Sequence, residues 1–105
     1  MSDKEIESLI QEKGLNAPRV TFEEIEELMS HVTYYVHQIP DTTTITVTAF
    51  DKNGFSLATE ISACASPENF DYELGKKIAI EKCEKVAQDT LWVLEGYRLK
   101  RNLEA

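Results

Sequence analysis

Apolar residues recur along the chain with the spacing of helices near both ends and of strands in the middle. Residues 3–13 carry only a thin apolar stripe, so a helix there is marginal unless it docks on the rest of the protein. A second helix is predicted from Thr21 to about Ser30, because Thr21 and Glu24 form a capping box in which each side chain satisfies a free backbone N–H. Residues 16–18 between them are predicted to be a linker.

The middle of the chain predicts three strands. Residues 32–39 are rich in β-branched and aromatic side chains, and Pro40 closes the run. Alternation along this strand places Tyr34 on one face and both Tyr35 and His37 on the other. The next two strands form a hairpin around residues 51–54.

Two hairpin loops are compatible with the turn sequence. A two-residue loop would split the apolar side chains between the faces, whereas a three-residue loop with Gly54 in a left-handed bulge gathers them on one face. We predict the bulged loop, in which Asp51 pairs with Phe55. The side chains expected to face the helix are Ile45, Val47, Ala49, Leu57 and Ile61, with Ala49 opposite Leu57, Val47 opposite Thr59 and Ile45 opposite Ile61. The other face is expected to carry Thr44, Thr46, Thr48, Phe50, Ser56, Ala58, Glu60 and Ser62.

A continuous apolar stripe from Asp71 to about Gly96 predicts a long C-terminal helix. Gly75 inside it indicates close packing or a break in the helix. This helix is longer than a three-stranded sheet can cover. Its far end, with Trp92 and Tyr97, is therefore expected to meet the N-terminal helix or another subunit.

Together these elements predict an α+β fold with two N-terminal helices, a three-stranded antiparallel meander and a long C-terminal helix packed on one sheet face. At 105 residues the chain is predicted to be a single domain, 1–105. Residues 1–20 are expected to be loosely attached to a core of residues 21–99. The second sheet face is predicted to be open.

Composition narrows the functional class. Nineteen acidic against 11 basic side chains give a formal charge of −8, which disfavours contact with nucleic acids and anionic membranes and suits plain solubility or a basic partner. Two cysteines are too few for a disulfide framework. The apolar runs are far shorter than the roughly 20 residues of a membrane span, and the N-terminus does not resemble a signal peptide. We therefore expect a cytoplasmic protein that binds no membrane.

Candidate chemistry is sparse. The possible soft metal ligands are His31, His37, Cys64 and Cys83, which lack the spacing of a zinc site. The sequence contains no nucleophile motif, and its four glycines stand singly, so no phosphate-binding loop is predicted. We expect a protein that is not an enzyme and takes no metal or other cofactor.

Nucleic-acid binding is the alternative hypothesis. From Thr21 onward the predicted order of one helix, three strands and one helix resembles the double-stranded-RNA-binding domain, with Lys76 and Lys77 where that family places phosphate-contacting lysines. The acidic charge opposes this interpretation, and both lysines are explained more simply by the solvated face of a helix. Nucleic acid is thus an unlikely partner.

Protein binding requires the fewest assumptions. Exposed aromatic side chains are typical of interfaces. The candidate interaction surface on the open sheet face comprises Tyr35, His37, Thr46, Thr48 and Phe50. Tyr35 covering only a strand neighbour is the competing interpretation.

Residues 42–99 also carry a series of short motifs. These are Thr42, Thr43, Thr44; Asn53, Gly54, Phe55; Ser62, Ala63, Cys64; Pro67; Asn69, Phe70, Asp71; Glu73; Gly75; Lys77; Ala79; and Leu91, Trp92, Leu94, Glu95, Gly96, Tyr97, Leu99. In this order they resemble a family of small proteins encoded by tailed bacteriophages and prophages. The chain departs from that pattern where Ile61, instead of an acidic residue, precedes Ser62, and where the stretch between Gly75 and Trp92 is longer.

The resemblance implies a phage accessory protein that acts in the host cytoplasm, in a family without an assigned activity. Its motif residues are interpreted as scaffold: Phe70 and Trp92 as core anchors, Gly75 and Gly96 as points of close approach or helix ends. Our leading hypothesis is a non-catalytic module that binds a host or phage protein, with pairing of two copies through the C-terminal helix. Sequestration of a small nucleotide is a third hypothesis, suggested by phage biology and by no residue pattern.

Overall fold

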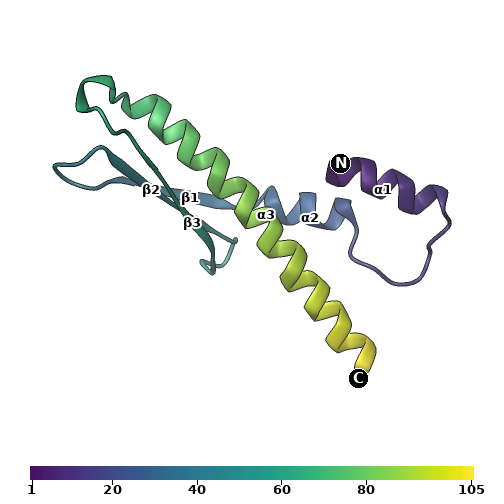
Figure 1. Cartoon of the computed structure of the whole chain (residues 1–105). Coiled ribbons are helices and arrows are strands. Elements are labelled where there is room, and N and C mark those ends of the chain that lie inside the picture. The colour runs from purple at the N-terminus through teal and green to yellow at the C-terminus, as the bar shows by residue number, and fades with distance from the viewer.

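The computed structural model describes residues 1–105 and confirms the predicted α+β fold (Figure 1). Three antiparallel strands form one sheet in the order β1-β2-β3. The elements are α1 (Asp3–Glu12), α2 (Phe22–Met29), β1 (Thr33–Gln38), β2 (Thr44–Phe50), β3 (Ser56–Ala63), the short 3-10 helix η1 (Pro67–Asn69) and α3 (Tyr72–Glu104).

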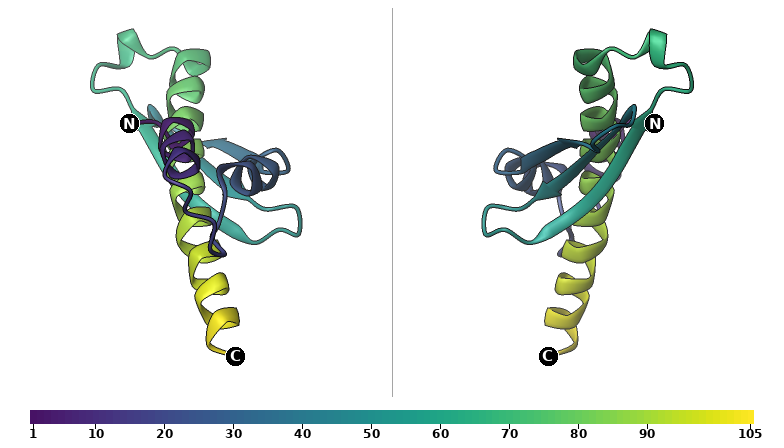
Figure 2. Two further views of the ribbon diagram at one scale, coloured as in Figure 1. Left: turned by 90° about the vertical axis from the view of Figure 1, so that its right-hand side faces the viewer. Right: turned by 90° about the vertical axis from the view of Figure 1, so that its left-hand side faces the viewer.

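The sheet and α1 lie on opposite sides of α3. In one view of Figure 2, α1 is in front of α3 with the sheet behind it, and in the reverse view the sheet is in front. One sheet face packs on α3, and no helix covers the other. The core between sheet and helices consists of Ile25, Ile45, Val47, Ala49, Leu57, Ala79, Cys83, Ala87 and Leu91.

Side chains at the helix starts satisfy backbone N–H groups that the helix leaves free. The Thr21 hydroxyl accepts a hydrogen bond from the N–H of Glu24 at 3.1 Å, which confirms the predicted start of α2. Asp71 accepts from the N–H of Leu74 at 3.0 Å and begins α3.

The far end of α3 extends further than predicted. The helix has 33 residues and continues to Glu104, so Gly96 lies inside it, and nothing would lie within 4 Å of a Cβ added at Gly96. The prediction that Gly96 marks a close approach or a helix end is therefore wrong. A single glycine costs a helix only about 1 kcal/mol, and the helix formers that follow it offset this cost.

The hairpin turn has the predicted form. The N–H of Asp51 donates to the carbonyl of Phe55 at 2.9 Å, and Gly54 has a φ of 82°. Beyond the turn the predicted register is wrong. Phe50 pairs with Ser56 but Ala49 pairs with Ala58, so Leu57 is an extra, bulged residue in β3.

This bulge exchanges the faces of the rest of β3. Ile61 is 51% exposed on the open face, while Ser62 is buried against α3, the reverse of the prediction for both residues. Thr59 is likewise on the open face, and Ala58 and Glu60 are half-buried on the helix side. The physical reason is the close approach of α3: the Ser62 hydroxyl donates to the carbonyl of Gly75 at 2.8 Å, where an isoleucine side chain would not fit.

The two helical glycines of α3 provide a matched test of this close approach. A Cβ at Gly75 would lie 2.9 Å from Cδ1 of Ile45, as the predicted close packing requires. We expect Gly75→Ala to lower the free energy of unfolding by about 1–2 kcal/mol, because overpacking outweighs the gain in helix propensity. Gly96→Ala should raise it by up to about 1 kcal/mol. Urea unfolding measures both, and equal stabilisation by the two variants would contradict the packing at Gly75.

Candidate functional site

The five residues of the predicted interaction surface lie together on the open sheet face. The register between β1 and β2 places Tyr35 opposite Thr48 and His37 opposite Thr46. Phe50 lies at the end of the same row, opposite Thr33. The structure thus brings all five side chains onto two neighbouring strands.

Tyr35 and His37 form the aromatic part of this face. Their rings stack with centroids 6.5 Å apart and an interplanar angle of 22°. Tyr35 nevertheless remains 64% exposed. The stacking agrees with the interpretation that Tyr35 covers a strand neighbour, and the exposure leaves most of its ring free for a partner.

Sequence reasoning missed Ile61, which the bulge brings onto the open face opposite Thr46. Its only signal in the sequence is the pair of consecutive apolar residues Leu57 and Ala58, which interrupts the alternation in β3. None of the side chains on this face belongs to Asp, Glu, Lys or Arg, although such residues make up 29% of the chain. The open face is therefore an uncharged surface of hydroxyl, aromatic and aliphatic groups.

The two lysines of the nucleic-acid hypothesis lie at the start of α3. Lys77 is exposed and Lys76 is half-buried, and both border a shallow depression together with Glu73 and Glu81. Two carboxylates beside two ammonium groups cancel most of the local positive potential. The helix thus presents a mixed charged surface rather than a basic patch.

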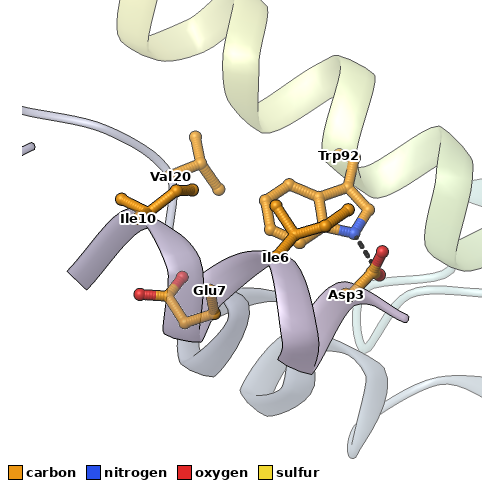
Figure 3. Close-up of a pocket in the computed structure, with 6 residues that line it drawn as sticks. All are labelled: Asp3, Ile6, Glu7, Ile10, Val20 and Trp92. Carbon is orange, nitrogen blue, oxygen red and sulfur yellow. Dashed lines mark hydrogen bonds between the residues drawn. The ribbon is translucent and has the colours of Figure 1, made fainter. Parts of the chain in front are cut away.

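A cleft of about 210 Å³ separates α1 from α3 (Figure 3). Its walls are largely apolar, and Trp92 of α3 faces Ile6 of α1 across it. The indole N–H of Trp92 donates to Asp3 at 2.8 Å, and the amide of Gln88 donates to the same carboxylate oxygen at 2.7 Å. The expected contact between Trp92 and the N-terminal helix is confirmed.

Glu7 holds the middle of α1. Its carboxylate accepts two hydrogen bonds from the Arg19 guanidinium, at 2.8 and 2.5 Å, and one from the N–H of Phe22 at 3.1 Å. These bonds, the Arg19 bonds first, lower the pKa of Glu7 from 4.5 to about 2. Sequence reasoning did not single out Glu7 or Arg19, because salt-bridge partners twelve residues apart leave no pattern in an acidic chain.

A second cleft, of about 180 Å³, lies where β3 passes into α3, and several motif residues line it. Most of their polar groups bond to the fold itself. The Thr43 hydroxyl donates to the Cys64 carbonyl at 2.6 Å, and the Cys64 thiol donates to the Ser66 carbonyl at 3.1 Å. Phe70 and Trp92 pack against the core, as expected of scaffold residues.

Two further observations concern metal binding and membranes. The structure contains no group of three or more His, Cys, Asp or Glu side chains arranged to hold a metal ion. Cys83 is fully buried, and burial raises the pKa of its thiol. No α-helix combines the length and the apolar character required to cross a membrane.

Comparison with known proteins identifies the family. The model of the Phage protein (N4 Gp49/phage Sf6 gene 66) family matches residues 20–103. The chain belongs to this family. The predicted phage resemblance is thus confirmed, over a wider segment than the motifs span. The family match includes α2, the sheet and nearly all of α3, but not α1. No curated protein and no solved structure matches the chain significantly.

The contacts of Glu7 predict that acid releases α1. Because its folded pKa of about 2 is below its ordinary value of 4.5, Glu7 stabilises the docked α1 above pH 4.5 and loses this contribution as pH falls toward 2. Trp92 is the only tryptophan, so its fluorescence reports the release of α1 as a shift to longer wavelength over this range. Glu7→Gln should show weaker docking at pH 7 and a smaller fluorescence step between pH 4.5 and 2, because the Asp3 contact with Trp92 remains. Glu5→Gln, on the exposed side of α1, is the matched control and should behave like wild type. A Glu7→Gln profile with the same acid step would show that Glu7 does not anchor α1.

Proposed function

We propose that this phage-family protein is a non-catalytic interaction module that acts in the host cytoplasm and binds a host or phage protein through its open sheet face. The observation that carries the proposal is the exposure of Tyr35 and Ile61 on an uncharged face that no helix covers. Exposed aromatic and aliphatic groups among hydroxyl groups are typical of protein interfaces.

Three ionisable side chains that could take part in catalysis are instead hydrogen-bonded or buried within the fold, which supports a non-catalytic role. Acid–base catalysis requires a group that is free to exchange a proton with substrate. The most strongly shifted carboxyl, Glu7, uses both oxygens to bind Arg19, and Asp71 caps α3. The buried thiol of Cys83 lies in the core, with a raised pKa that disfavours the nucleophilic thiolate.

We further propose that two copies pair through the C-terminal half of α3. Val86, Val93 and Tyr97 are exposed, and together with Thr90 they follow the alternating spacing of four and three residues that aligns side chains along one face of a helix. Val93 is 70% and Tyr97 53% exposed. The last part of α3 extends beyond the sheet, where a second helix can reach it (Figure 1).

Binding of double-stranded RNA is the alternative, and it has less support. The order of elements from α2 onward agrees with it, but Lys76 and Lys77 share their surface with Glu73 and Glu81. The charge of −8 opposes the approach of phosphates.

The open face is tested by placing a charge on it. A tagged protein is used to isolate a stoichiometric partner from infected host cells, and the affinity for the purified partner is then measured by calorimetry. We expect Tyr35→Asp/Ile61→Asp to weaken binding at least tenfold, because each carboxylate loses water at the interface without gaining a partner. Leu15→Asp alters an equally exposed apolar residue away from this face and should bind like wild type. An unchanged affinity in the double variant would exclude the open face.

Self-association through α3 is tested by light scattering. We expect Val93→Glu/Tyr97→Glu to reduce the solution mass by half, because like charges would then face each other between two copies. Lys85→Glu, exposed elsewhere on α3, should keep the wild-type mass. A double variant with the wild-type mass would exclude this interface.

A further inference from the structure

The outer edge of β1 is an unpaired strand. The sheet order makes β1 an edge, and α3 packs on β2 and β3 rather than on β1. The N–H of Ile39 donates to the Thr44 carbonyl at 2.9 Å, which fixes the direction of the backbone groups. Because these groups alternate in an antiparallel pair, odd-numbered residues of β1 face β2. The N–H and C=O groups of Tyr34, Val36 and Gln38 therefore point outward from the sheet.

The opposite edge of the sheet is protected. β3 carries the bulge at Leu57, and the ammonium group of Lys82 in α3 donates to the outward carbonyl of Ile61 at 3.2 Å. Bulges and lysines are the devices with which proteins prevent edge strands from pairing. β1 has neither: its six residues, Thr33–Gln38, include no charge, no proline and no bulge.

We propose that β1 pairs antiparallel with β1 of a second copy and joins two three-stranded sheets into one. A two-fold axis perpendicular to the sheet places the outward backbone groups of one β1 opposite those of the other. The N–H and C=O groups of Tyr34, Val36 and Gln38 then form hydrogen bonds with the same groups of the second copy. On the open face, Tyr35 then lies opposite His37 or Tyr35 of the second copy.

A second copy fits this edge for electrostatic reasons. Two chains that each carry −8 repel one another at most orientations. β1 contains no Asp, Glu, Lys or Arg, so two copies approach one another along this edge with the least electrostatic repulsion. The pairing extends the open face across both copies without covering it. It is independent of the α3 interface and of any partner protein.

Hydrogen exchange by NMR tests the pairing in the wild-type protein. At a protein concentration where β1 pairs with β1 of a second copy, the amides of Tyr34, Val36 and Gln38 should exchange at least tenfold more slowly than in dilute solution. The amides of Tyr35 and His37, which bond within the sheet, should be protected at both concentrations and serve as the internal control. Fast exchange of the three outward amides at all concentrations would overturn the proposal. Protection that appears only when a partner protein is added would also overturn it, since the edge would then accept another chain.

Charge variants on the open face provide the second arm. Tyr35→Lys/His37→Lys should abolish the slow exchange of the outward amides and leave Thr33 protected, because lysines would face lysines across the two-fold axis. Tyr35→Glu/His37→Glu should do the same. An equimolar mixture of the two variants should restore protection, which a folding defect could not do. A mixture without restored protection would contradict the proposed pairing. The variant Val93→Glu/Tyr97→Glu should retain the protection, which separates this interface from the one along α3.

Discussion

The structure depends on the close approach of α3 to the sheet. The residues of this helix that face the sheet follow at every fourth position and are small where the contact is closest: Gly75 comes first, and the buried Ala79, Cys83, Ala87 and Leu91 follow. Four residues advance an α-helix by about 40° more than one full turn, so this row rotates slowly around the helix. A rotating row suits a twisted sheet, because the contact surface of such a sheet also turns along its length. Small side chains bring the backbones close enough for the bond between Ser62 and the Gly75 carbonyl.

The bulge at Leu57 follows from the same constraint. If β3 kept a regular register, Ile61 would point toward α3 where the helix leaves no room for a branched side chain. One extra residue lets Leu57 fill the core and replaces Ile61 by Ser62 at the point of closest approach. The cost is an isoleucine exposed on the open face. The packing of one face therefore determines the composition of the other, and Ile61 joins Tyr35 there because of α3.

Local signals predicted most of the fold. The cap at Thr21 and the turn with Gly54 depend on neighbouring residues, so the order of elements could be read directly from the sequence. The bulge could not, because it results from the shape of a helix that comes later in the chain. The contact of Trp92 with the N-terminal helix was expected, but its partner Asp3 was missed: the two residues are 89 apart, and in an acidic chain no carboxylate stands out as a partner. For the candidate site, the alternation of side chains along each strand correctly placed Tyr35, His37 and Phe50 on one face. Ile61 of β3 was found on the same face only in the structure.

The α1 helix and the rest of the molecule are stabilised by different kinds of contact. The segment from α2 to α3 surrounds a continuous apolar core, whereas α1 is attached mainly through Asp3 and Glu7 and leaves much of its apolar stripe exposed. Carboxylate contacts respond to pH and salt, and apolar contacts respond little. The family match begins after α1, so the segment shared with the family contains the apolar core but not α1. The acidic charge repels anionic surfaces, whereas the open face and the outer edge of β1 carry no Asp, Glu, Lys or Arg side chain, so electrostatic repulsion is weakest there.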